Sequence, residues 1–165
     1  MQERCKIGVV IGNANSPHAV NIMKGIDQAS KECDVQIMYF MNVSSPYTAQ
    51  LYPPDTSIGW DYQKSAIYDY ARYVKADVLI MTYGMMSIFM KSDYGKQYLE
   101  YFRNVPCVLI NEQTDRPNWT SIIVDNYNGI YELVEHLVRD HGYHNFAFLA
   151  GPPGNTDACQ RKRAF

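Results

Sequence analysis

The sequence has little net charge and no strongly basic face. Its 165 residues include 15 basic and 17 acidic side chains, which gives a net charge of -2. A nucleic-acid-binding module normally carries a basic patch or stripe, so this balance argues against nucleic-acid contact by the chain itself. The one basic cluster, residues 161–163, is interpreted as the solvated face of a helix.

Long apolar runs are also missing. The charged start, MQERCK, leads into IGVVIG, which is too short for a signal-peptide core or a membrane span. We therefore expect a cytoplasmic protein without membrane contact.

Cysteine is scarce and is not arranged for metal binding. The four cysteines stand at positions 5, 33, 107 and 159, without a Cys-x-x-Cys pair, so reduced thiols are expected. His136, His141 and His144 bracket a helix end, where two of them could contact a metal. No acidic residue stands at ligand spacing, and a solvated turn is the preferred interpretation. We predict no metal and no cofactor.

Signatures of the common enzyme classes are absent or incomplete. The segment GPPGNT at 151–156 lacks the Gly-Lys-Ser/Thr ending of a phosphate-binding loop. Gly8 and Gly12 do not complete a dinucleotide fingerprint, and no Gly-x-Ser-x-Gly elbow occurs. The chain is not expected to be an enzyme.

What is present is an alternation of apolar runs with helical patterns. Apolar runs without polar alternation predict strands buried on both faces, and spacing of three to four residues predicts helices. Strands are predicted at 6–11, 35–41, 77–82 and 106–110, and helices at 17–31, 62–74 and 94–102. From 124 onward we predict a further strand, helix and strand, with the helix at 127–138 and its following strand at 146–149. The fold class is α/β with a doubly wound parallel sheet.

The residues that follow the predicted strands are polar. In open parallel sheets ligands bind beyond the carboxyl ends of the strands. Ser16 caps a helix that begins with proline, Thr82 ends the third strand, and Asn111 follows the fourth. Such groups suit a neutral, hydrogen-bonding small molecule. The Pro- and Ser-rich segment 42–59 is interpreted as a long loop, either a flap over a ligand or a surface insertion.

Four segments resemble the effector-binding core of the LacI/GalR (lactose/galactose-repressor) family. They are IGVVIGNANSPHAVNIMKGIDQAS, ADVLIMT with VPCVLIN, VDNYNGIYELVEHLVRDHGYHNFAFLAGPPGN, and DACQRKRAF. The resemblance implies a periplasmic-binding-protein-like fold of type I. Residues 1–123 would form the first lobe, and 124–165 the start of the second.

The resemblance also implies roles for individual residues. His18 matches a position that packs on the ligand, and Thr82 and Asn111 match strand-end positions that hydrogen-bond ligand hydroxyls. Asn155 and Asp157 match the loop that faces the cleft, and Arg161 matches an arginine that reaches into it. The alternative for Arg161 is a surface arginine, and for His18 a capping or partly buried histidine.

Three departures from the family pattern shape the hypothesis. No helix-turn-helix region precedes the first strand. The RDHGYH segment resembles sensor domains fused to GGDEF-type diguanylate cyclases or histidine kinases. The chain ends at Phe165, where family members continue. We hypothesise a homodimeric sensor of a small, sugar-like polar effector that signals to an output module. The alternative is a truncated dimerisation module of the same fold that binds no ligand.

Overall fold

A computed structural model describes residues 4–43, 62–87, 92–151, 153 and 155–165 of the chain. The chain divides into two compact units, Met1–Ile123 and Val124–Phe165, and each is described by itself. The proposed loop at 42–59 lies, from residue 44 onward, outside the described residues. Within the described residues no helix is long and apolar enough to cross a membrane.

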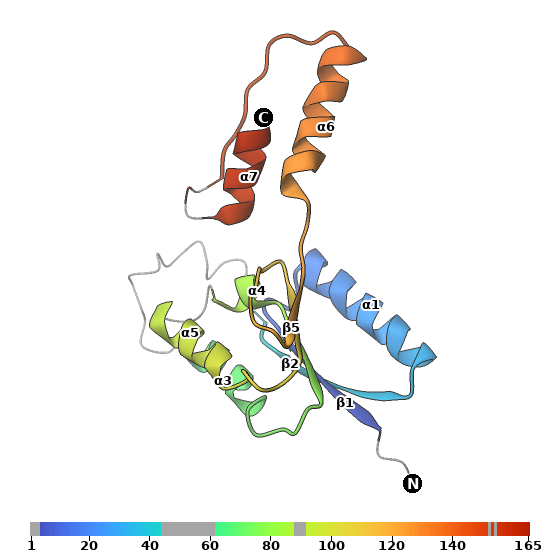
Figure 1. Cartoon of the computed structure of the whole chain (residues 1–165), viewed down its shortest axis with the longest axis vertical. Helices are drawn as coiled ribbons and strands as arrows, with labels where there is room; N and C mark the ends of the chain where they lie inside the picture. Colours follow the sequence, from blue (N-terminus) through green and yellow to red (C-terminus); the bar gives the residue numbers. More distant parts are fainter. Residues whose placement is uncertain (1–3, 44–61, 88–91, 152, 154) are drawn as a thin grey trace. The chain divides into compact units, whose positions relative to one another are not determined.

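The described part of the first unit contains a five-stranded parallel sheet in the order β2-β1-β3-β4-β5 (Figure 1). The strands are β1 Cys5–Ile11, β2 Val35–Met41, β3 Val78–Met81, β4 Cys107–Ile110 and β5 Trp119–Ile122. The predicted α/β fold with a doubly wound parallel sheet is confirmed. The fifth strand was not predicted as a separate strand, because WTSI alternates and carries two hydroxyl residues.

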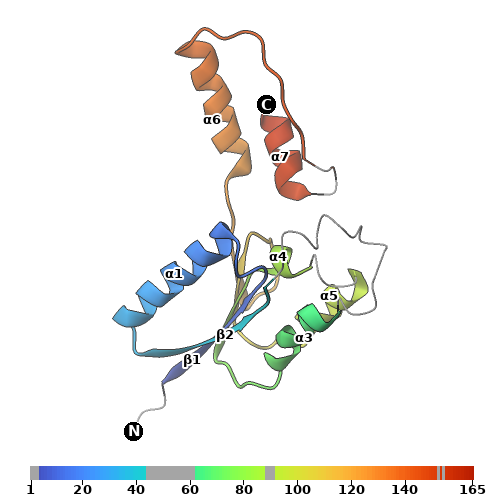
Figure 2. The same ribbon diagram turned by 180° about the vertical axis from the view of Figure 1, so that it is seen from behind.

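Helices cover both faces of this sheet (Figures 1 and 2). On one face α1, Pro17–Glu32, packs against Val9 and Ile11 of β1. On the other face α3, Tyr62–Tyr70, and α5, Ser92–Glu100, contribute Tyr68 and Tyr98 to the larger core cluster, which also contains Val10. Successive residues of β1 thus point to opposite cores, which is why its sequence shows no polar alternation.

Two helical segments differ from the prediction. The helix predicted at 62–74 ends at Tyr70, and the chain continues in tight turns in which Ala71, Arg72 and Tyr73 donate to carbonyls three residues earlier. A short helix, α4, spans Tyr83–Ser87 directly after β3, where only a polar segment was expected. Local bonds from the Met85 and Met86 amides to the Thr82 carbonyl form this turn.

The described part of the second unit consists of two helices, α6 Asn126–Arg139 and α7 Thr156–Ala164, with irregular chain between them. The predicted helix at 127–138 is confirmed, but the strand predicted at 146–149 is wrong. A strand requires hydrogen bonds from a neighbouring strand, and none lies in this described unit. The strand expected at its start is also wrong, because β5 ends at Ile122 and pairs with β4 in the first unit.

Candidate functional site

The carboxyl edge of the first unit's sheet is the candidate site. The chain passes from β1 to β2 on one side and then continues through β3 and β4 on the other. This reversal of strand order lies between β1 and β3, where open α/β sheets bind ligands. The residues that follow β1, β3 and β4 therefore define the edge to be considered.

His18 and Asn111 are brought together at this edge. His18 is exposed at the start of α1, and Asn111 is half-buried directly after β4. The Asn111 Nδ2 atom lies 2.9 Å from the His18 Nε2 atom. With the amide nitrogen as donor, Nε2 accepts and the neutral imidazole carries its proton on Nδ1. Two residues separated by 93 positions thus form one polar pair at this edge.

The backbone around Asn111 holds its side chain in place. Asn111 has a φ of 59°, in the left-handed region that asparagine tolerates better than most residues. Its amide donates to the Ile122 carbonyl over 2.8 Å, which ties the residue to β5. The side chain is therefore presented from a fixed point of the sheet edge.

Thr82 has a structural partner at the same edge. Its hydroxyl accepts a hydrogen bond from the Gly12 amide over 3.0 Å, and its side chain is buried. The bond joins the end of β3 to the turn after β1. A contact between Thr82 and a ligand stays a prediction, and the observed role of the hydroxyl is to fix the turn that leads to α1.

Asn42, at the end of β2, fixes the other side of this turn. Its Oδ1 accepts from the Asn13 amide over 2.7 Å, and its carbonyl accepts from the Ala14 amide over 2.9 Å. Asn13 has a φ of 49°, a left-handed conformation that the two bonds hold. The Asn42 Nδ2 atom is buried without a partner in the described part of the chain. The turn preceding α1 is therefore held by side chains from the ends of β2 and β3, the two strands that flank β1.

Glu112 and Tyr83 also belong to this edge, although the sequence analysis did not select them as site residues. Burial raises the pKa of Tyr83, and the negative charge of Glu112 raises it further. A Cβ atom added at Gly84 would lie 4.0 Å from Glu112 Oε2, which places the carboxylate close to the start of α4. The available signal was position, because Glu112 directly follows Asn111 at a strand end. A carboxylate here favours ligands that donate hydrogen bonds, such as hydroxyl groups.

The other three predicted site residues lie together on α7 in the second unit. Asn155 caps this helix, because its Oδ1 accepts from the Ala158 amide over 2.8 Å. Asp157 lies in the first turn, and its carbonyl accepts from Arg161 Nε over 3.2 Å. Arg161 is exposed. Asn155 thus has a capping role that the prediction did not include.

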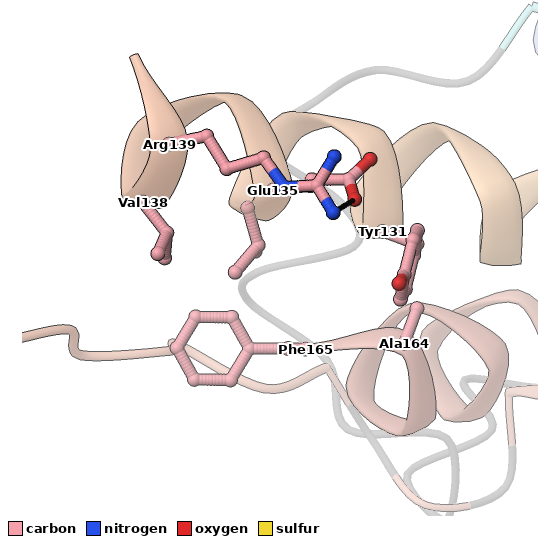
Figure 3. A pocket seen from close by; sticks show the side chains of 7 residues that line it. Tyr131, Glu135, Val138, Arg139, Ala164 and Phe165 are labelled. Carbon is pink, nitrogen blue, oxygen red and sulfur yellow. Dashed lines mark ion pairs between the residues drawn. The ribbon is translucent and has the colours of Figure 1, made fainter. Parts of the chain in front are cut away.

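A pocket of about 240 Å³ lies between α6 and α7 (Figure 3). It is lined by Tyr131, Val134, Glu135, Val138, Arg139, Ala164 and Phe165. The Glu135 and Arg139 side chains form an ion pair of 2.9 Å above an apolar floor. None of the six predicted site residues lines this pocket, so it is distinct from the candidate site.

The cysteines show no reactive arrangement among the described residues. All four are free, and Cys107 is buried in the larger core. Burial raises the pKa of the Cys107 thiol to about 12, against a smaller lowering by Arg116, so the thiol stays protonated at neutral pH. No group of three or more His, Cys, Asp or Glu side chains in the described ranges is arranged to hold a metal ion.

Comparison with curated proteins yields one similar repressor. No protein-family model matches the chain. The probable HTH-type transcriptional repressor ExuR of Bacillus subtilis (strain 168) is 26% identical over 59% of this chain and 32% of its own length. The chain thus spans about a third of that curated relative.

Solved structures resemble nearly the whole chain. A lac repressor dimer bound to operator and the anti-inducer ONPF has a TM-score of 0.67 at 19% identity, covering 99% of this chain and 50% of that one. A carbohydrate transporter solute-binding protein from Agrobacterium radiobacter, in complex with D-arabinose, has a TM-score of 0.65 at 16% identity, covering 100% and 52%. The transcription regulator CcpA of Lactococcus lactis gives 0.61 at 15% identity, covering 98% and 53%.

The chain spans about half the length of these structures, and at such identities the likeness concerns the fold. The parallel sheet with helices on both faces agrees with it. The chain therefore has the periplasmic-binding-protein-like α/β fold that LacI-type repressors share with sugar-binding proteins.

Proposed function

We propose that the chain is part of a ligand-sensing regulatory domain that binds a small polar metabolite, of a sugar-like kind, at the carboxyl edge of its sheet. The His18 and Asn111 pair carries this proposal. It joins the start of α1 to the end of β4 at the edge where the fold class binds ligands. The imidazole and the amide together offer donors and acceptors that match hydroxyl groups.

The regulatory part of the proposal draws on the relatives. ExuR is named as a probable transcriptional repressor, and the similar structures include a repressor with an anti-inducer and a transporter protein with D-arabinose. We extend ligand sensing to this chain as a non-enzymatic function. Residues 1–123 act as the first lobe and 124–165 as the start of the second. The output is transcription regulation or a signalling module such as a GGDEF diguanylate cyclase or a histidine kinase.

The second unit contributes Asn155, Asp157 and Arg161 to ligand binding in this proposal. An arginine presents five donors in a fixed fork, which can hold two adjacent oxygen atoms of a sugar or a carboxylate. Arg161 is exposed, and its Nε atom donates to the Asp157 carbonyl within the described helix. The residue is thus suited to binding an oxygen-rich ligand.

Melting temperatures across a panel of sugars, sugar acids, nucleosides and amino acids test the proposal. A ligand that binds only the folded state raises the melting temperature with its concentration. Asn111→Gly removes the amide while it tolerates the positive φ, and Arg161→Ala removes the fork. Both should abolish the shift given by the best ligand, whereas Lys162→Ala, one position further along α7, should retain it. Silence across the panel, or a shift that neither variant changes, rejects the sensor function for this chain.

A dimerisation module that binds no ligand is the second candidate. The exposed apolar side chains of the second unit favour it, with Leu149 98% exposed and Leu133 52% exposed. Sedimentation equilibrium separates the two candidates. A concentration-dependent dimer without any ligand response supports the module, and a ligand response lost in Asn111→Gly supports the sensor.

A further inference from the structure

Three polar side chains, none of them a predicted site residue, meet at the carboxyl end of α6. His136 Nδ1 lies 2.5 Å from Asp140 Oδ2, and His136 Nε2 lies 3.1 Å from His141 Nε2. The sequence analysis interpreted this segment as a solvated turn with no acidic partner. The structure instead places the Asp140 carboxylate at one nitrogen of His136 and His141 at the other.

Asp140 determines which nitrogen of His136 is free to bind. A carboxylate accepts hydrogen bonds, so Nδ1 of His136 carries the proton and donates to Asp140. The Nε2 atom of His136 in this tautomer has a lone pair and lies 3.1 Å from His141 Nε2. A carboxylate on the remote nitrogen is the usual partner of a metal-binding histidine, because it fixes the tautomer and orients the ring.

The relative position of the rings is compatible with a shared ion. A linear bond between the two Nε2 atoms would place the ring centroids roughly 5.4 Å apart. If both lone pairs pointed at one ion about 2.05 Å from each nitrogen, the centroids would lie roughly 4.8 Å apart at this nitrogen separation. The observed centroid distance is 4.8 Å. The corresponding nitrogen–ion–nitrogen angle of about 98° lies between octahedral and tetrahedral values.

The backbone and a neighbouring ring support this arrangement. Gly142 has a φ of 66°, and its amide donates to the Val138 carbonyl, so the chain folds back over the last turn of α6. The ring of Tyr143 stacks on His141 with centroids 5.7 Å apart and planes 13° from parallel. Arg139, the nearest cation in sequence, pairs with Glu135. Both imidazoles are thus held by local contacts.

From this geometry we infer that His136 and His141 bind a divalent transition metal ion, such as Ni²⁺ or Zn²⁺, through their Nε2 atoms. Asp140 positions His136 and does not need to bind the ion. Imidazole suits these borderline metals. Because the described residues offer no third protein ligand here, water or another donor completes the coordination. The site is open and does not depend on the sensor function.

Isothermal titration of the full chain with NiCl₂ in a non-chelating buffer tests the site. The exposed thiols of Cys5, Cys33 and Cys159 are first replaced by serine, because thiolates compete for metal. One ion per chain should bind. His136→Gln and His141→Gln should each weaken binding at least about tenfold, and Asp140→Asn about tenfold through loss of ring orientation. His144→Gln is the matched control and should bind like the parent.

Pulsed electron paramagnetic resonance of the Cu²⁺-loaded protein gives a second, independent readout. Nitrogen couplings from two imidazoles should appear in the parent and from one in His136→Gln. Circular dichroism checks that each variant is folded. The His136 side chain is exposed, so we expect its substitution to leave the fold intact. Unchanged Ni²⁺ affinity in both His136→Gln and His141→Gln, or couplings from a single imidazole in the parent, overturns the inference.

Discussion

Leu79 in the first unit and Leu133 in the second are the same residue type in opposite environments. Leu79 is 1% exposed at the centre of the sheet, whereas Leu133 on α6 is 52% exposed. The difference extends to the units as a whole, since the buried residues of the second unit are only Asn126, Ala158 and Ala164 among those described. The first unit has a complete local core, and the second presents an apolar surface.

This contrast separates what holds the fold from what is available for binding. Burial of apolar side chains is the main contribution to the free energy of unfolding, so stability resides in the first unit. A group of exposed apolar side chains, such as the second unit carries, is typical of an interaction face. Substitutions matched between the units test this division.

The largest difference is expected between Leu79→Ala and Leu133→Ala. Removing a buried leucine side chain loses its transfer free energy and leaves a cavity, so Leu79→Ala should lower the free energy of unfolding by about 2 to 5 kcal/mol. Leu133→Ala removes a half-exposed group and should cost less than about 1 kcal/mol. Urea unfolding followed by circular dichroism gives both values. Equal costs would mean that α6 is covered in solution, which breaks the comparison.

A smaller effect is expected at the turn after β1. A Cβ atom at Gly12 would lie 2.6 Å from the carbonyl carbon of Met85 and 2.9 Å from the Met86 amide nitrogen. These are backbone atoms of α4 that cannot rotate away, so Gly12→Ala should destabilise the first unit by about 3 kcal/mol.

Gly25→Ala in α1 is the matched control for this substitution. Nothing lies within 4 Å of its added Cβ atom, and alanine favours helix by up to about 1 kcal/mol. The control should therefore be neutral or stabilising. Tryptophan fluorescence monitors the first unit, since Trp60 and Trp119 both precede residue 124. A Gly12→Ala protein as stable as the parent would show that α4 does not pack on this turn.

The Thr82 hydroxyl is expected to contribute less to the free energy of unfolding than Leu79→Ala or Gly12→Ala removes. Thr82→Val keeps the shape of the side chain but leaves the buried Gly12 amide without its acceptor, which costs about 1 to 3 kcal/mol. Thr82→Ser retains the hydroxyl and should recover most of this loss. Thr120→Val, on the exposed side of β5, is the control and should change stability by less than about 0.5 kcal/mol. Equal unfolding curves for Thr82→Val and the parent would show that the bond from the Gly12 amide to the Thr82 hydroxyl does not stabilise the fold.

The first unit could be predicted well because its signals are local and agree with one another. The buried strands have apolar runs such as VVI in β1, and Ser16 with Pro17 marks the start of α1. In the second unit the helix was predicted but the strand was wrong, because FAFL at 146–149 has the composition of a strand but no described neighbour to pair with. Composition reports a preference for burial, whereas a strand depends on a partner that the segment itself does not encode.

The candidate site shows the same division between local and long-range information. Position after a strand pointed to Thr82 and Asn111, whereas His18 was selected through the resemblance to the LacI/GalR family. The bond between Thr82 and Gly12, and the contact of His18 with Asn111, depend on sheet order and register, which join residues 70 and 93 positions apart. The influence of Glu112 on Tyr83 depends on α4, which has only five residues and no clear periodic pattern.

The smallest expected effect concerns Asp125, which caps α6 in the less covered unit. Bonds from the Asn128 amide, over 3.0 Å, and from the Asn128 side chain, over 2.7 Å, lower the pKa of Asp125 below its ordinary value of 3.8. A carboxyl group whose pKa is lower in the folded state stabilises the fold above its unfolded pKa. This contribution is lost as the pH falls through the folded pKa, so α6 should begin to fray below a pH of about 4.

Asp125→Asn separates this titration from the capping itself. Asparagine caps helices about as well as aspartate but does not titrate in this range. Amide hydrogen exchange at Asn128 should therefore become faster on acidification in the parent, and this acceleration should be weaker in the variant. The start of α1, capped by the uncharged Ser16, supplies the internal control, since exchange at Ala19 has no cap carboxylate to lose. Identical pH profiles at Asn128 in the parent and the variant would show that the two bonds to Asp125 do not persist in solution, and that α6 begins without this cap.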